Sequence, residues 1–226
     1  MPDSRKRRTV ETGEADERLG EPDKRKAILR AAVQVFAAKG YQGCRIADVA
    51  QRAEVAYGLV YHYFKNKDDL LESVFDQQWR LFIQMLRSIQ AGPGSASEQL
   101  AAVCGSTLDA VWRDPSTARV LLLEMTRHQK GLREEKEWSV EAAIEVISEI
   151  VQQGQRTGEL RPEADPLVIA TALLGALEVC LTSMLMGVLV RPDPTEEEIA
   201  RVKRNLIEFL VAGVAVSPAQ RAASAS

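Results

Sequence analysis

The sequence is poor in the residues that build metal centres and redox sites. Its 226 residues include two histidines and three cysteines, Cys44, Cys104 and Cys180, which form no CxxC pair. Zinc sites need Cys and His at short, regular spacing, so we expect no metal site and no cofactor. No glycine-rich phosphate loop follows a strand, because no strand-like alternation occurs. These absences disfavour an enzyme, although acids on every helix leave an acid–base pair open.

The N-terminal residues also lack an apolar stretch. Residues 1–22 are rich in charge, have no apolar period and carry the basic run Arg5–Arg8. They are predicted to be a disordered tail without a secretory signal, so we expect a cytoplasmic protein. The basic run either solubilises the chain or, as a hypothesis, lies along DNA. A second disordered tail is predicted for residues 217–226.

Apolar residues recur at helical spacing along the rest of the chain, and glycine and proline mark the breaks. The pattern predicts an all-α fold of about nine helices, near 24–39, 46–53, 57–63, 68–90, 96–113, 116–129, 134–157, 166–189 and 195–216. We expect a three-helix head at 23–67 and a larger helical body at 68–216. A head of this size buries little apolar surface, so it is expected to lean on the helix that follows.

The most informative segment is residues 44–70, where two short helical segments meet at the tripeptide Glu54-Val55-Ala56. A three-residue turn between short helices is typical of a helix-turn-helix, and Val55 is large enough to fill the angle between them. Apolar side chains fall on the inner face of the two helices: Ile46, Val49, Ala50, Ala53, Leu59, Val60 and Phe64. The outer face of the second helix carries Tyr57, Gly58, Tyr61 and His62.

An outer face with tyrosines, a histidine and a glycine is unusual for a solvated helix. Tyrosine hydroxyl groups can donate to base edges or phosphates, and a glycine lets the backbone approach a partner closely. Asn66 and Asp69 form a capping-box-like pair, and Lys67 beside that helix start suits a phosphate. The alternative is an ordinary helical hairpin with solvated charges. The combination of spacing, aromatics and caps favours a DNA-contacting surface.

Charge supports this interpretation. The whole chain carries 29 basic and 32 acidic residues, but Lys24–Lys67 holds nine Lys and Arg against Asp48 and Glu54. This segment is therefore about +7 and the remainder about −10. A basic head on an acidic body favours nucleic-acid binding.

These residues resemble the DNA-binding signature of TetR-type repressors, through Ile46, Val49-Ala50, Ala53, Val55, Gly58, Tyr61, Tyr63-Phe64, Lys67 and Leu70. The resemblance spans about fifty residues and implies that the 57–63 helix enters the major groove. It implies base contacts from Tyr57, Gly58 and Tyr61, and phosphate contacts from His62, Tyr63 and Lys67. Arg45, which is unusual at its position, is a further candidate for a phosphate contact.

The chain departs from the family pattern at Cys44, Glu54 and Ala56. Cys44 and Ala56 offer no capping oxygen, a loss of roughly 1 kcal/mol per helix. Glu54 is expected to adopt a positive φ, at about 1 kcal/mol or more. As a further hypothesis, Cys44 is a redox-sensing thiol.

Residues 166–190 are long and apolar enough to span a bilayer, with Glu178 as the single ionisable residue. An acid at the centre and the lack of flanking Lys or Arg clusters favour a buried helix over a membrane span. The resemblance implies a homodimer through a four-helix bundle of the helices near 166–189 and 195–216. Two heads one helical turn apart then read a palindromic DNA operator.

The body holds more apolar bulk than a thin bundle needs, which indicates a ligand pocket. The candidate pocket residues are Trp112, Leu122, Met125, Trp138, Glu178 and Met184, and the candidate anion contacts are Arg119, Arg127 and His128. Each of these is alternatively a core or solvated side chain, and for Glu178 a hydrogen-bonded core carboxylate is an equal reading. The head also resembles TetR-type regulators of fatty-acid degradation, which implies acyl-coenzyme A as an effector.

The sequence therefore predicts a ligand-responsive, homodimeric transcriptional repressor that a small, largely apolar effector releases from DNA. The alternative is a helical interaction or membrane-associated protein that does not use its head on DNA.

Overall fold

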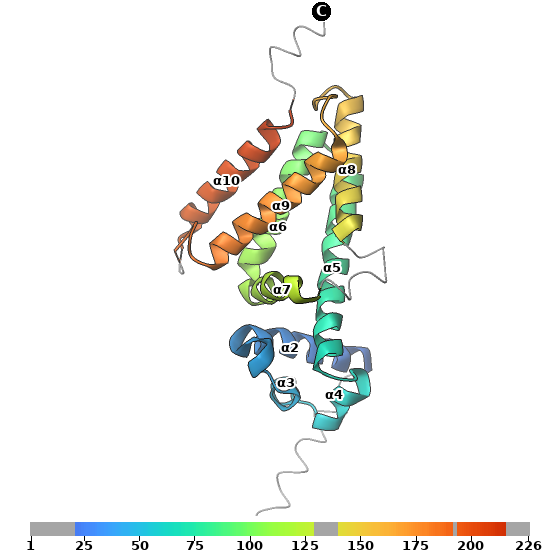
Figure 1. The fold of residues 1–226 in the computed structure, drawn as a ribbon, viewed down its shortest axis with the longest axis vertical. Coiled ribbons are helices and arrows are strands. Elements are labelled where there is room, and N and C mark those ends of the chain that lie inside the picture. Colours follow the sequence, from blue (N-terminus) through green and yellow to red (C-terminus); the bar gives the residue numbers. More distant parts are fainter. Residues whose placement is uncertain (1–20, 129–139, 192–193, 216–226) are drawn as a thin grey trace, which may run out of the picture. The chain divides into compact units, whose positions relative to one another are not determined.

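The computed structural model describes residues 21–128, 140–191 and 194–215, with the backbone alone for 21–22 and 123–128. The described residues form nine helices and no strand, which confirms the all-α prediction. The helices, shown in Figure 1, are α2 (Glu21–Gly43), α3 (Ile46–Arg52), α4 (Tyr57–Tyr63), α5 (Lys67–Ala91), α6 (Ala96–Arg113), α7 (Pro115–His128), α8 (Val140–Arg156), α9 (Pro166–Leu185) and α10 (Glu196–Ala212).

Several helix starts follow from local capping chemistry. Ser95 caps α6, and its hydroxyl oxygen accepts from the backbone N–H of Glu98 at 3.2 Å. The Glu98 carboxylate in turn accepts from the N–H of Ser95, which lowers the pKa of Glu98. Asp165 caps α9 directly before Pro166, a residue whose fixed φ suits the first helical position.

The helix ends differ from the predicted ends where backbone geometry intervenes. The helix expected at 166–189 ends at Leu185, because Met186 is its C-cap and Gly187 has a φ of 74°. The last helix ends at Ala212 instead of residue 216. Gly40 interrupts α2 with a φ of 68°, at the position where the sequence predicted its end. The expected start of α8 near 134 and the predicted tails, except 21–22, lie outside the described residues.

The contacts divide the chain into two compact units, and the first takes the residues up to Gln78 together with Ser116–His128. Its core brings together side chains from α2, α3, α4, α5 and α7. The main buried residues are Ile28, Leu29, Phe36, Val49, Val60, Phe64, Leu70, Leu71, Phe75 and Val120. Because α5 and α7 supply the last four of these, the helix-turn-helix does not form its core alone, as its small size led us to expect.

The second unit contains Trp79–Pro115 and the residues after His128. Within it α8 packs on α9 and α6, and α10 packs on α6 (Figure 1). Its buried core includes Ile83, Leu86, Leu100, Val103, Ile147, Ile150, Leu160, Leu173 and Leu177. The ammonium group of Lys203 on α10 lies 2.7 Å from the carboxylate of Asp109 on α6, and this ion pair ties the two helices.

Helix α9 is partly buried in the single chain. Among the described residues it is the one helix long and apolar enough to cross a membrane, and 33% of its most apolar window is buried. One face enters the core through Ala170, Leu173 and Leu177. The opposite face exposes apolar residues, including Val168 and Val179. The expectation of a buried helix therefore holds for one face of α9 only.

Candidate nucleic-acid interface

Helix α3 begins with a backbone cap formed by its own third residue. Arg45 is the N-cap, and its backbone N–H donates to the Asp48 carboxylate at 3.1 Å. The ammonium group of Lys39 lies 2.9 Å from the same carboxylate. The hydrogen bond from Lys39, followed by that from Arg45, lowers the pKa of Asp48. The cap position is Arg45 and not Cys44, and Arg45 makes no side-chain capping bond, so the expected lack of a capping oxygen at the start of α3 falls on Arg45.

Cys44 is buried in the core of the first unit. Burial raises the pKa of its thiol, and the nearby charge of Lys67 opposes that shift. A buried thiol with a raised pKa is mostly protonated and reacts slowly with oxidants. The structure therefore gives no support to the hypothesis of a redox sensor.

The turn between α3 and α4 has the strained geometry that the sequence predicted. Glu54 has a φ of 57°, and it is the one non-glycine residue with a positive φ among the described residues. Val55 donates its backbone N–H to the carbonyl oxygen of Ala50 at 3.0 Å and packs against the core. Ala56 is the N-cap of α4 and makes no side-chain capping bond, as expected.

Helix α4 separates its two faces as predicted. Val60 and the following Phe64 are buried, and Leu59 is half-buried. The opposite face exposes Tyr57 by 54% and Tyr61 by 46%. The buried side chains therefore anchor the helix in the core, while the two tyrosines on its opposite face are exposed to solvent.

The two exposed tyrosines form a pair. The Tyr57 hydroxyl donates to the Tyr61 hydroxyl at 3.3 Å, and the rings meet edge to face with centroids 5.3 Å apart. The hydrogen bond between the two hydroxyls raises the pKa of Tyr61, whose phenol, like that of any tyrosine, is protonated at neutral pH. Gly58 is exposed beside them, and a side chain there would meet nothing within 4 Å. The pair and the glycine form an exposed surface, which we call the reading face: Tyr57, Gly58 and Tyr61.

The four residues predicted to hold phosphates are placed differently from one another. Arg45 and His62 are exposed, and Tyr63 is half-buried with its ring 5.1 Å from that of His62. Lys67 is half-buried, and its ammonium group donates to the backbone carbonyl oxygens of Tyr41 at 2.8 Å and Cys44 at 3.1 Å. These backbone partners lie 26 and 23 residues from Lys67 along the sequence, so no local sequence pattern predicts them.

The candidate pocket residues that the structure describes differ in exposure. Trp112 and Glu178 are exposed, Leu122 is half-buried and Met184 is buried. The exposure of Glu178 corrects its interpretation as a core carboxylate. Arg119 is exposed. The side chains of Met125, Arg127 and His128, and the whole of Trp138, lie outside the described residues, so the pocket remains a prediction.

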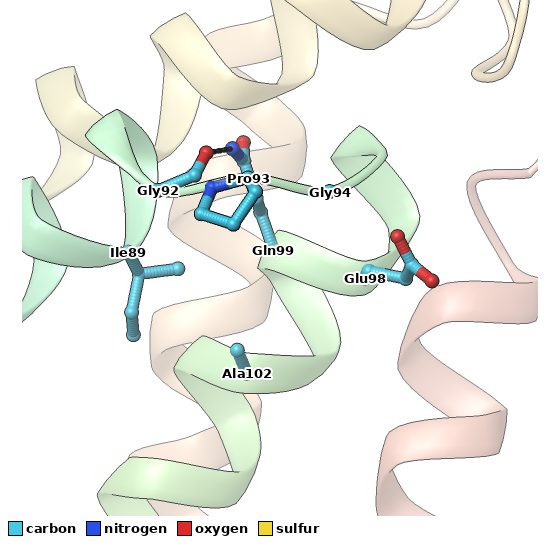
Figure 2. Close-up of a pocket in the computed structure, with 7 residues that line it drawn as sticks. All are labelled: Ile89, Gly92, Pro93, Gly94, Glu98, Gln99 and Ala102. Atoms are coloured by element: carbon cyan, nitrogen blue, oxygen red, sulfur yellow. Dashed lines mark hydrogen bonds between the residues drawn. The ribbon is translucent and has the colours of Figure 1, made fainter.

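A depression of about 610 Å³ lies at the turn between α5 and α6 and contains none of the predicted residues. It is lined by Ile89, Gly92, Pro93, Gly94, Glu98, Gln99 and Ala102 (Figure 2). The buried Gln99 amide donates to the carbonyl oxygens of Gln90 and Gly92, both at 3.2 Å, and fixes this turn. The role of this amide was not predicted, because its partners are two backbone carbonyl groups.

Two family models match consecutive parts of the chain. Residues 28–74 match the bacterial regulatory proteins of the tetR family, and residues 75–189 match the C-terminal region of YsiA-like proteins. The second match alone covers half of the sequence. The chain belongs to the tetR family. It is a ligand-responsive, DNA-binding transcriptional regulator, and the alternative of a protein that does not use its head on DNA falls away.

Individual relatives match between two thirds and five sixths of the chain. A fatty acid metabolism regulator protein from Bacillus subtilis (strain 168) is 26% identical over 187 residues, which are 83% of this chain and 93% of the relative. The repressor NicS from Pseudomonas putida is 29% identical over 68% of this chain and 72% of its own length. The crystal structure of FadR from Bacillus subtilis with stearoyl-CoA is 26% identical, with a TM-score of 0.72 over 83% of this chain and 98% of that chain.

Proposed function

We propose that this tetR-family regulator is a cytoplasmic, homodimeric repressor that places α4 of each subunit in the major groove of a palindromic operator. The reading face carries this proposal, because it is exposed while Val60 and Phe64 hold the helix in place. Tyrosine hydroxyls can donate to the acceptor atoms of base edges, and a glycine allows close approach of the backbone. Tyr57, Gly58 and Tyr61 therefore read bases.

Residues beside the reading face hold the DNA backbone. Arg45 and His62 are exposed, and the half-buried Tyr63 packs its ring against His62. Such contacts fix the register of a protein on DNA without reading sequence. Lys67 belongs to the same set, because its ammonium group donates to two backbone carbonyl groups and keeps a third N–H for a phosphate.

The dimer forms through α9 and α10. Val168 and Val179 on α9 are exposed by 64% and 66%, and Phe209 on α10 is exposed by 75%. Monomeric proteins seldom leave so many large apolar side chains on two helices in water. A second copy of the chain covers this surface, and two reading faces then meet two half-sites.

The effector is an acyl-coenzyme A. The support is the likeness to FadR from Bacillus subtilis, whose structure was determined with stearoyl-CoA. Binding of this effector shifts the protein toward a state in which the two reading helices no longer match the operator spacing. Such a shift extends only as far as the effector discriminates between the two states.

The operator proposal is tested by selection of duplex DNA from a random library with the full chain. We expect a palindrome to be enriched, and its affinity to fall about a thousandfold between 50 and 200 mM salt, because a dimer neutralises six or more phosphates. If no sequence is enriched, the proposal of a repressor that reads DNA sequence is refuted.

The effector proposal is tested on the selected duplex by fluorescence anisotropy. Stearoyl-coenzyme A is compared with free coenzyme A and with stearate. We expect stearoyl-coenzyme A, which is the thioester, to release DNA at low concentration. Free coenzyme A and stearate should leave the DNA bound. Unchanged DNA affinity at saturating stearoyl-coenzyme A would rule out this effector and leave the operator proposal intact.

A further inference from the structure

The exposed face of α9 carries a single charged side chain. The helix contains no lysine, arginine or histidine between Pro166 and Leu185, and Glu178 is its one acid. Glu178 is exposed beside Val179. Within the described part of the chain, its carboxylate takes part in no hydrogen bond or ion pair. In the single chain this acid is therefore solvated.

A second copy that covers this face changes the surroundings of Glu178. The proposed dimer buries Val179, which is exposed by 66%, and Glu178 is its neighbour in sequence. A carboxylate that loses its water is strongly unfavourable unless a cation or hydrogen-bond donors replace that water. The α9 helix of the second copy has no cation to offer. The charge that matches Glu178 therefore belongs to another element.

The exposed face of α10 supplies such a cation. No side chain of α10 is fully buried in the single chain. Arg201, Asn205 and Phe209 are all exposed and follow one another at intervals of four residues, a spacing that places side chains on one face of a helix. Around the helix, Arg201 lies about 80° from Phe209 and Arg204 about 140° from it. Arg201 is therefore the arginine nearer to the exposed ring.

Other cations close to Arg201 in sequence already have partners. The ammonium group of Lys203 lies 2.7 Å from the carboxylate of Asp109, and the guanidinium group of Arg191 lies 3.1 Å from that of Glu198. Arg201 makes no hydrogen bond or ion pair within the residues that the structure describes. Its guanidinium group is available to a second copy.

Gly175 leaves room beside Glu178. A side chain at Gly175 would meet nothing within 4 Å in the single chain, so packing inside the chain does not require a glycine there. Residues three apart are neighbours on a helix surface, so a long side chain from a second copy can lie over Gly175 and reach Glu178. Arginine suits this place, because its planar group matches a carboxylate with two parallel hydrogen bonds.

We propose that Glu178 of each subunit forms an ion pair across the dimer interface with Arg201 on α10 of the second copy. The proposal rests on the proposed homodimer through α9 and α10. In an interface with twofold symmetry, the contact from Glu178 to Arg201 also occurs in the reverse direction, so the dimer contains the pair twice. The two pairs fix the alignment of the subunits, because a shifted alignment leaves four charges without partners.

The experiment exchanges the two charges in the full chain. Dimer dissociation constants are measured by analytical ultracentrifugation for Glu178→Arg, for Arg201→Glu and for the variant with both substitutions. The matched control combines Glu178→Arg with Arg204→Glu, which gives the same composition and net charge as the exchange. Glu145→Arg, at an exposed position of α8, controls for the reversal of one acid. Thermal unfolding is recorded for each variant.

We expect each single reversal to weaken the dimer about a hundredfold or more, because two like charges then face each other at both copies of the pair. The exchanged variant should recover dimerisation to within about tenfold of wild type. The combination with Arg204→Glu should remain as weak as Glu178→Arg alone, and Glu145→Arg should match wild type. This pattern requires a specific partner for Glu178 and not only a change of net charge.

Neutral variants measure the same contact without placing like charges together. Glu178→Gln and Arg201→Gln are examined singly and combined, which keeps the test decisive if a reversed variant does not fold. For residues in contact, the double variant should weaken the dimer no more than one single variant does. Losses that multiply in the double variant would show that the two side chains act independently.

Three further results would overturn the pair and leave the dimer standing. The first is a reversal of Glu178 or Arg201 that leaves dimerisation at the wild-type level. The second is an exchanged variant that dimerises no better than the single variants. The third is equal recovery in the combination with Arg204→Glu. If the wild-type chain sediments as a monomer at every concentration, the proposed homodimer itself fails, and the pair fails with it.

Discussion

At the scale of single residues, the start of α4 is weakly capped. Ala56 has the extended backbone of an N-cap, with φ of −63° and ψ of 140°, but no side-chain oxygen to accept a hydrogen bond from α4. The first N–H groups of a helix have no partners within it. On DNA, this uncapped end leaves its N–H groups available beside the reading face.

Ala56→Ser should stabilise α4 by about 1 kcal/mol, because serine supplies the missing acceptor. Amide hydrogen exchange within α4 measures this change directly. Ala47→Ser, at the exposed second residue of α3 and not at its cap, is the control and should be neutral or slightly destabilising. Equal effects of the two substitutions would contradict the assignment of Ala56 as the cap.

Residues whose geometry depends on near neighbours were predictable from the sequence, and those with distant partners were not. The positive φ of Glu54 followed from its place in a three-residue turn. The partners of the Lys67 side chain could not be predicted in this way, because a lysine beside a helix start has the same local sequence whether it contacts a phosphate or a carbonyl group. Gln99 was missed for the same reason, since an amide inside a helix carries no sign of its backbone partners.

At the scale of elements, α4 has one face buried in the core and an opposite face exposed to solvent. Glycine inside a helix costs stability because of its backbone freedom. Gly58 has open space around its missing side chain, so packing does not require it. Close approach to DNA is the remaining physical reason for a glycine at this position.

Gly58→Ala should therefore have opposite effects on stability and on binding. We expect α4 to gain up to about 1 kcal/mol in hydrogen exchange, and operator affinity to fall about tenfold or more. The control is Gly43→Ala, which adds the same methyl group at an ordinary 3.6 Å from Lys39 Cβ, away from α4. Undiminished operator affinity in Gly58→Ala would show that this position does not approach DNA.

Helix periodicity predicted where the helices lie along the chain, but it predicted less well which of their faces are buried. The nearly continuous apolar sequence of α9 indicated a buried helix, but such a sequence cannot tell whether a face is covered by the same chain or by a second copy. Glu178 illustrates the limit, because its apolar neighbours in sequence suggested burial and the side chain is exposed in the single chain. The helix end at Leu185 was missed although Gly187, with a positive φ directly after the Met186 cap, is a local stop signal.

At the scale of the whole molecule, the exposed apolar face of α9 and α10 supports a dimer. It includes Val179 on α9, which is exposed by 66%. An aspartate there would place a charge in a dry interface, where an unpaired charge is strongly unfavourable.

Val179→Asp should convert the dimer into a monomer, as measured by analytical ultracentrifugation. Operator affinity should fall by more than a hundredfold, because a monomer reads one half-site, and each tenfold loss corresponds to about 1.4 kcal/mol. Gln152→Asp, at an exposed polar position on α8, is the control and should remain dimeric. A Val179→Asp variant that sediments as a dimer would place the interface elsewhere.

The central claim is that the reading face selects bases, and the base preference of Tyr57→Ala and Tyr61→Ala tests it most directly. Selection from a random duplex library gives the preference at every operator position for wild type and each variant. We predict a loss of about 1 to 3 kcal/mol confined to particular base pairs, with an unchanged salt dependence. An equal loss at all positions, with the wild-type preference retained, would contradict the claim.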